Sequence, residues 1–210
     1  MFDRNRLTQL ISAAEKGARI PRQPKGQARI IGITGPPGVG KSTLIDRLIT
    51  AWRKQNKTVA IVAVDPSSPI TGGALLGDRL RMQHHSSDAG VFIRSLATRR
   101  HSGGLAASTR AIVRILDAAG FDLVVVETVG AGQNDVAIAD LADTVVVVLM
   151  PELGDEIQRA KSGLMEIADI VVINKSDLGQ TTTGLAVSAK TGSGVAELVA
   201  AIEAQQKPAR

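Results

Sequence analysis

The sequence predicts an α/β fold of three layers, with a mostly parallel sheet and a short N-terminal helical arm. From residue 28 onward, strand-like and helix-like segments alternate, which is typical of parallel sheets joined by right-handed crossovers. The strand-like segments are continuous apolar runs, as expected of strands that are covered on both faces. One of these runs leads into a glycine-rich turn followed by a helix-like segment. These three observations place the ligand-binding loops at the carboxyl ends of the strands.

The predicted elements follow in order along the chain. The arm is expected to span 1–27, with an amphipathic helix at 7–18 and a Pro- and Gly-containing linker at 21–26. The main domain is expected to span 28–204, and a polar tail 205–210. Strands are predicted at 28–34, 58–64, 91–94, 121–126, 145–149, 170–173 and 185–187, and helices from 42 onward, at 105–119 and at 195–204.

The composition indicates one globular domain with an aliphatic core. The chain has 210 residues, of which 44% are hydrophobic, 21% charged and only 2% aromatic. The lack of cysteine excludes disulfides and thiolate metal sites and suits a reducing compartment, so we expect a cytoplasmic protein. No apolar run has the length of a membrane span, and the N-terminus lacks the apolar segment of a secretory signal.

The formal charge of +5 does not by itself indicate a nucleic-acid partner. The basic residues are scattered and are not interleaved with aromatic ones. One dense basic cluster contains Arg94, Arg99, Arg100 and His101. We therefore expect neither a nucleic acid nor a membrane as partner, and interpret the charge as a basic surface around an anion-binding cleft.

The glycine-rich turn fits the phosphate-loop pattern G-x-x-x-x-G-K-[ST] at every fixed position. Backbone N–H groups of such a loop and the helix N-terminus bind phosphates, so the domain is predicted to be a P-loop NTPase. Lys41 would reach the β- and γ-phosphates, and the Ser42 hydroxyl would be a ligand of Mg²⁺. The predicted phosphate-binding residues are Gly35, Pro36, Pro37, Gly38, Val39, Gly40, Lys41, Ser42 and Thr43.

Two later loops are predicted to bind the base. Asn174, Lys175 and Asp177 follow a predicted strand in the pattern N-K-x-D. The Asp177 carboxylate would accept from guanine N1 and the 2-amino group, donors that adenine lacks, which favours GTP over ATP. Ser188, Ala189 and Lys190 are the candidate second base loop; the alternative is an ordinary strand-to-helix turn.

Acidic residues at strand ends are the candidate magnesium ligands. Asp65 and Glu127 each end a predicted strand, and Asp78 is a third candidate, although it could equally be a solvated loop carboxylate. With Ser42 they complete the predicted metal set. Glu127 to Gly130 occupies the place of the D-x-x-G pattern, so the Gly130 N–H is expected to sense the γ-phosphate.

The catalytic assignments beyond Lys41 and Glu127 are less specific. Gln133 could orient the attacking water or simply contact loop backbone, and Lys161 could neutralise phosphate charge or be a solvated helix lysine. No general base can be identified. Arg94, Arg99 and Arg100 are available as arginine fingers, but none is assigned.

The histidines do not favour a metal site. His84 and His85 are adjacent on a segment expected to be exposed, where their side chains should point in different directions. No cysteine or further histidine beyond His101 supports them, so we do not predict a metal there.

With these motifs, the chain resembles the MeaB/ArgK-like P-loop GTPases over about residues 28–178. The resemblance is carried by the phosphate loop and by segments that begin at Val64, Thr71, Glu127 and Gly154. It implies slow Mg²⁺-dependent hydrolysis of GTP to GDP and phosphate. It also implies a chaperone-type role in cofactor loading and protection of a cobalamin-dependent methylmalonyl-CoA mutase. The family's acidic residues fall on Asp65, Asp78 and Glu127.

Two departures from the family pattern leave other readings open. Only 178–184 separate Asp177 from the last predicted strand, whereas a parallel crossover usually needs about a dozen residues or more. The family also carries further helices, which build its dimer, beyond the position of Arg210, so a homodimer remains an open prediction. The alternatives are a nickel-insertion GTPase and a nucleotide-binding protein with little turnover.

Overall fold

The protein is described here from a computed structural model, which describes residues 2–66, 82–98, 104–128, 138–151, 163–179 and 184–205. The sheet order is β3-β2-β4-β1-β5-β6-β7, and every recorded pairing is parallel. The strands are β1 (Arg29–Thr34), β2 (Val59–Pro66), β3 (Val91–Thr98), β4 (Leu123–Thr128), β5 (Thr144–Leu149), β6 (Ile170–Ile173) and β7 (Leu185–Ala186). The predicted α/β fold with a parallel sheet is confirmed.

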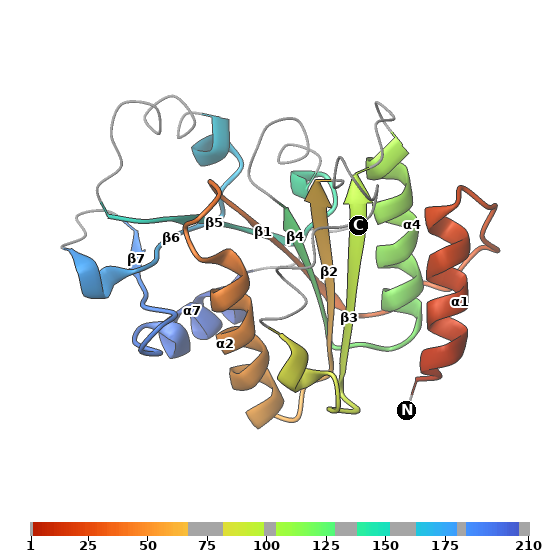
Figure 1. Cartoon of the computed structure of the whole chain (residues 1–210), viewed down its shortest axis with the longest axis horizontal. Coiled ribbons are helices and arrows are strands. Elements are labelled where there is room, and N and C mark those ends of the chain that lie inside the picture. The colour runs from red at the N-terminus through yellow and green to blue at the C-terminus, as the bar shows by residue number, and fades with distance from the viewer. Residues whose placement is uncertain are drawn as a thin grey trace.

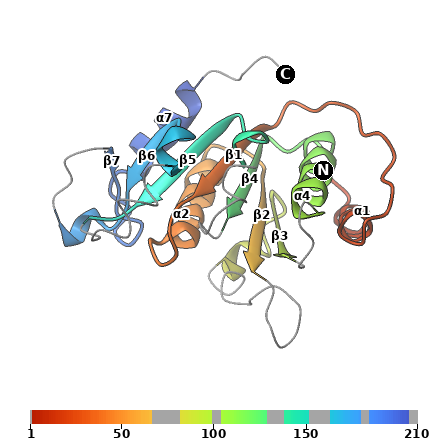
Figure 2. The same ribbon diagram turned by 90° about the horizontal axis from the view of Figure 1, so that it is seen from above.

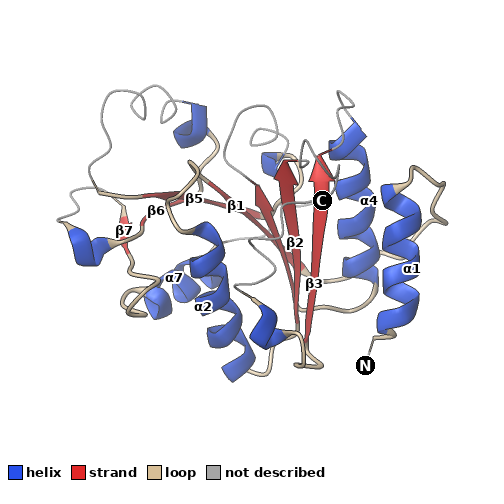
Figure 3. Ribbon diagram, viewed as in Figure 1, coloured by secondary structure: helices blue, strands red, loops and turns tan. Residues whose placement is uncertain are grey.

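Helices cover both faces of this sheet, so the molecule has three layers (Figure 1, Figure 2). One face packs against α2 (Lys41–Lys54) and α7 (Val195–Ala204), and the other against α4 (Gly104–Ala118) and α1 (Arg4–Glu15). Two short 3₁₀ helices, η1 (Gln83–His85) and η2 (Ser176–Leu178), lie in connections. Figure 3 shows the strands between the two helical layers.

Most strand residues are apolar because successive side chains enter different cores. Ile31 and Ile33 pack on the α2 side, whereas Ile30 packs on the α4 side. The same alternation holds in β4, where Val125 and Val124 enter opposite cores. With few aromatic residues, both cores consist largely of Val, Ile and Leu, with Trp52 added on the α2 side and Phe92 and Phe121 on the α4 side.

The N-terminal helix is part of the second core. Its apolar stripe, Leu7, Ile11 and Ala14, is buried and belongs to the cluster around α4. Asp3 caps the helix by accepting from the N–H groups of Asn5 and Arg6. The predicted helix at 7–18 is thus observed three residues earlier, because the cap at Asp3 fixes its start.

The short connection after Asp177 still leads to a parallel strand. β7 pairs with β6 through Val172 with Leu185 and Ile173 with Ala186. The strand contains only two residues, fewer than the three predicted. In contrast, β3 extends four residues beyond the predicted end at Arg94, because it pairs with β2 along its whole length.

The topology places the phosphate loop at the point where the strand order reverses. β1 lies between β4 on one side and β5 on the other, and the loop leaves its carboxyl end. In open α/β sheets, ligands bind at this position. Among the described helices, none combines the length and apolar character needed to cross a membrane.

Candidate functional site

The phosphate loop has the backbone conformation that its glycines allow. Gly35, Gly38 and Gly40 all have positive φ, at 141°, 79° and 91°. A Cβ on Gly35 would lie 2.0 Å from the carbonyl oxygen of Val148 in β5, and one on Gly40 would lie 2.6 Å from Nδ2 of Asn174. The loop therefore passes too close to its neighbours at these two positions for any other residue.

The amine of Lys41 lies inside the loop. Its Nζ donates to the carbonyl oxygens of Gly35, at 2.7 Å, and Pro36, at 3.0 Å, and the side chain is buried. A buried ammonium group surrounded by loop backbone is well placed to meet an anion in the same loop. The structure thus brings Lys41 to the position that the sequence motif predicts.

Ser42 of α2 and Glu127 of β4 are in direct contact. The Ser42 hydroxyl at the start of α2 donates to Oε1 of Glu127, the penultimate residue of β4, over 2.8 Å. Both side chains are buried. Hydroxyl and carboxylate oxygens are the hard donors that Mg²⁺ prefers, so this pair fits the ion. Asp65 lies in β2, which pairs with β4, but its side chain is outside the described residues.

Several predicted residues lie outside the described residues altogether. They are Asp78, Gly130, Gln133 and Lys161, together with Arg99, Arg100 and His101 from the basic cluster. Arg94 is described, and its guanidinium forms an ion pair with Glu15 (Nη2 to Oε2, 2.5 Å) and a hydrogen bond to Ser12. These partners belong to α1, on the opposite face of the sheet from α2.

The two predicted base loops contact each other through side chains. The Ser188 hydroxyl donates to Oδ1 of Asp177 over 2.6 Å, and Asn174 Oδ1 accepts from the N–H of Ala189 over 2.9 Å. The hydrogen bond from Ser188 lowers the pKa of the Asp177 carboxyl, and the positive charges of Lys190 and Lys175 lower it further. Asp177 is therefore held as an acceptor, the form that guanine recognition requires.

The base loops also contact the phosphate loop. Asn174 Nδ2 donates to the carbonyl of Val39 over 2.8 Å, and Lys175 Nζ donates to that of Gly38 over 2.9 Å. Lys175 adopts a left-handed conformation, with φ of 60°, which a non-glycine residue rarely does. The amide of Asn174 retains one N–H and one lone pair beyond these bonds. The predicted phosphate and base residues thus form one connected site.

Arg47 is a member of this site that the sequence reasoning missed. Its guanidinium donates to the carbonyls of Ala189, at 2.8 Å, and Lys190, at 3.0 Å. It therefore connects α2 with the second base loop. A polar residue on the exposed side of a predicted helix carries no local signal for such a role.

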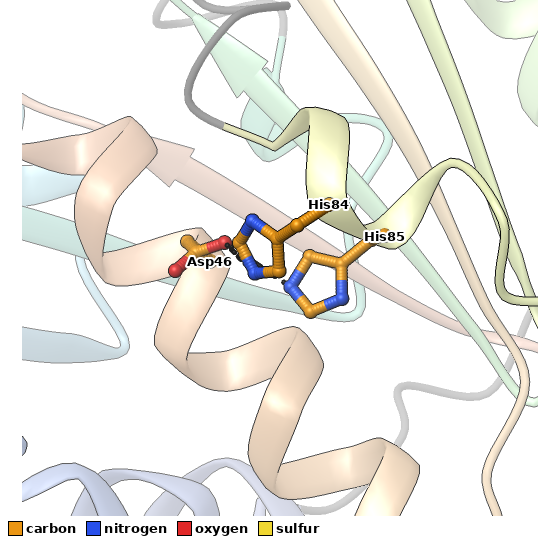
Figure 4. Close-up of side chains that lie close together, drawn as sticks. All are labelled: Asp46, His84 and His85. Carbon is orange, nitrogen blue, oxygen red and sulfur yellow. Dashed lines mark ion pairs between the residues drawn. The ribbon is translucent and has the colours of Figure 1, made fainter.

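The expectation for the two adjacent histidines is wrong. Their Nε2 atoms do not diverge: His84 and His85 both approach Oδ1 of Asp46, at 3.2 Å and 3.1 Å (Figure 4). Both histidine side chains of η1 reach the part of α2 that presents Asp46, and their ring centroids lie 4.0 Å apart. This cluster lies one helical turn beyond Ser42.

Comparison with known proteins points to one family. The model of the family described as "Methylmalonyl Co-A mutase-associated GTPase MeaB" matches residues 12–186. A Pyrococcus abyssi protein provisionally named a GTPase is 55% identical over 83% of this chain and 56% of its own length. GTPase ArgK of Escherichia coli is 40% identical over 78% of this chain and 49% of its own. This chain thus spans about half the length of the curated relatives it matches.

Solved structures share the fold at low sequence identity. A LAO/AO transport system kinase superposes with a TM-score of 0.63 at 24% identity, over 97% of this chain and 76% of that one. HypB from Helicobacter pylori, solved with nickel, gives a TM-score of 0.61 at 14% identity, over 98% of both chains. On the match of the family model and the identity to its relatives, the chain belongs to the MeaB family of methylmalonyl-CoA mutase-associated GTPases.

Proposed function

We propose that the chain binds GTP with Mg²⁺ and hydrolyses it to GDP and phosphate. The observation that carries this proposal is the connection of the phosphate loop to both base loops through Asn174 and Lys175. A nucleotide that fills one part of this site would contact the other. The lowered pKa of Asp177 keeps it ionised, and this carboxylate favours guanine over adenine because adenine lacks the N1–H and 2-amino donors.

Hydrolysis would occur by in-line attack of water on the γ-phosphorus, with the bond to the bridging oxygen breaking and GDP leaving. Lys41 would exchange its bonds to loop carbonyls for phosphate oxygens and stabilise the charge that develops there. Ser42 and Glu127, with Asp65 and Asp78 as further candidates, would hold Mg²⁺. When bound, Mg²⁺ supplies positive charge to the β- and γ-phosphates. Gln133 and Lys161 remain candidates for positioning water and neutralising charge, and Gly130 for sensing the γ-phosphate.

We further propose that the partner is a cobalamin-dependent methylmalonyl-CoA mutase. The chain would assist loading of the mutase's cofactor and protection of the mutase, in the cytoplasm, with a homodimer as the expected assembly. The support is the printed family description, together with a mouse relative named methylmalonic aciduria type A homolog, 40% identical over 81% of this chain.

The nucleotide proposal is tested by calorimetric titration with GDP and with ADP, each with Mg²⁺. GDP should bind with one equivalent, and ADP at least about 100-fold more weakly, since adenine has neither of the N–H donors that guanine offers to the Asp177 carboxylate. Equal binding of both nucleotides, or of neither, would contradict it.

The partner proposal is tested by adding the mutase and measuring phosphate release. The mutase should raise turnover, and its affinity for the chain should differ between the GTP and GDP states. A mutase affinity that is the same with GTP, GDP and no nucleotide would rule out a nucleotide switch.

A further inference from the structure

We propose that Asp46, His84 and His85 form a binding site for a divalent transition-metal ion such as Zn²⁺, separate from the nucleotide's Mg²⁺. Each residue offers one ligand atom, and these three atoms lie within 4.8 Å of one another. Two of the ligands come from η1 and the third from α2, as Figure 4 shows. The proposal does not depend on the nucleotide chemistry proposed above.

The distances fit a shared ion. The Nε2 atoms of His84 and His85 lie 3.2 Å and 3.1 Å from Oδ1 of Asp46. Zinc binds imidazole nitrogen and carboxylate oxygen at about 2.0–2.2 Å, so two ligands of a tetrahedral ion lie about 3.3 Å apart. The observed separations are within a few tenths of an ångström of this edge length.

The orientation of the groups supports an ion over a simple hydrogen-bonded cluster. His85 is buried, and neither its Nε2 nor Oδ1 of Asp46 makes a hydrogen bond, although the two atoms are 3.1 Å apart. An N–H aimed at the carboxylate would satisfy both atoms. Here Nε2 of His85 points to one side of Oδ1 of Asp46, so neither atom has a hydrogen-bond partner. A cation bound between the two atoms would accept a lone pair from each.

The ligand set selects the class of ion. Two imidazoles and one carboxylate suit Zn²⁺, Co²⁺ or Ni²⁺ better than Mg²⁺, which prefers an all-oxygen shell. The side chain of His84 is 61% exposed, whereas those of His85 and Asp46 are 10% and 19% exposed. Solvent therefore reaches the site from the His84 side, and a water molecule can supply the fourth ligand.

The experiment is calorimetric titration of the nucleotide-free chain with Zn²⁺, with excess Mg²⁺ present to occupy all-oxygen sites. We expect one equivalent to bind in the wild type and the affinity to fall at least about tenfold in His84→Ala, which removes an exposed ligand without opening the core. His101→Ala is the matched control, because the chain has only three histidines, and it should bind like the wild type.

Cobalt gives an independent readout. Co²⁺ in a tetrahedral nitrogen and oxygen site should produce visible absorption bands in the wild type, which should be lost in His84→Ala and in Asp46→Asn. Asp46→Asn keeps the side-chain shape but replaces a charged ligand with a neutral one. Failure of the wild type to bind Zn²⁺ would overturn the proposal, as would binding that His84→Ala and Asp46→Asn leave unchanged. Neither result would bear on the nucleotide proposal, which the GDP titration tests separately.

Discussion

The phosphate loop and the base loops form one site but are built in different ways. The phosphate loop is a single stretch of chain, in which glycines at 35, 38 and 40 adopt positive φ and Lys41 bonds the carbonyls of its own loop. The base loops come from two separate stretches, which the side chains of Asn174 and Ser188 join, and Arg47 of α2 donates to the second of them. The phosphate loop is set by local backbone geometry, whereas the base loops depend on side chains from three segments.

The largest effect is expected in the phosphate loop from Gly35→Ala. Its Cβ would meet the Val148 carbonyl at 2.0 Å, so either β5 or the loop must move. We expect the free energy of unfolding to fall by about 3 kcal/mol or more in urea unfolding. Gly38→Ala is the control, since its added Cβ meets nothing within 4 Å and it should lose only about 1 kcal/mol to its positive φ. Equal losses in both variants would refute the close approach to β5.

Lys41→Ala and Lys175→Ala compare two lysines that both donate to phosphate-loop carbonyls. Lys41 is buried in the loop, whereas the bond made by Lys175 is exposed. Phosphate release in the presence of the mutase should fall about 100-fold or more in Lys41→Ala, because a preorganised charge at the γ-phosphate is lost. Lys175→Ala should change turnover by less than about tenfold. Wild-type turnover in Lys41→Ala would disprove the assignment of the site.

Ser188→Ala tests the base loops without touching the phosphate loop. Removal of the hydroxyl deletes a 2.6 Å bond to Asp177 and the contact with the Thr191 N–H. The pKa of Asp177 should rise toward its ordinary value, since that bond is the largest cause of its lowering. We expect GDP affinity to fall about fivefold near neutral pH, with ADP binding unchanged. A parallel loss for both nucleotides would mean that Ser188 supports the whole site rather than base recognition.

The smallest loss of unfolding free energy is expected from removing an ion pair at the end of α2 that is remote from the phosphate loop. Arg53 Nε and Asp88 Oδ2 are 2.8 Å apart, and the hydrogen bond from Arg53 lowers the pKa of Asp88. A lowered carboxyl pKa contributes stability above the unfolded value near about pH 4, which is lost as pH falls through the folded value. Asp88→Asn should cost about 1 kcal/mol at neutral pH, because the pair is partly exposed.

That cost should shrink as the pH of urea unfolding is lowered from about 4 through the lowered folded pKa of Asp88, below which the wild-type carboxyl is itself protonated. Glu203→Gln is the control, because the pair of Glu203 with Lys57 is more exposed, and we expect no measurable change. GDP affinity should stay at the wild-type value in both variants. A cost for Asp88→Asn that is independent of pH would assign its effect to packing instead of charge.

Local pattern was sufficient for most of the elements. Continuous apolar runs predicted every strand of the sheet, and α7 begins and ends at the predicted residues, 195 and 204. The errors occurred where pairing or capping decides a boundary. Pairing with β2 extends β3 to Thr98, and the Asp3 cap starts α1 at Arg4. The apolar periodicity of a segment shows neither its neighbouring strand nor its capping residue.

Spacing within short segments was enough to predict the parallel α/β class, which the structure confirms, and it also predicts the phosphate-loop and base-loop residues. Tertiary packing sets the strand order, the contacts of Arg47 with Ala189 and Lys190, and the proximity of His84 and His85 to Asp46. These features join segments up to 143 residues apart, and the packing of α2 against the sheet and its neighbours sets their distances. A pattern within one segment cannot predict the distance between side chains of two segments, because that distance depends on how the helices pack on the sheet.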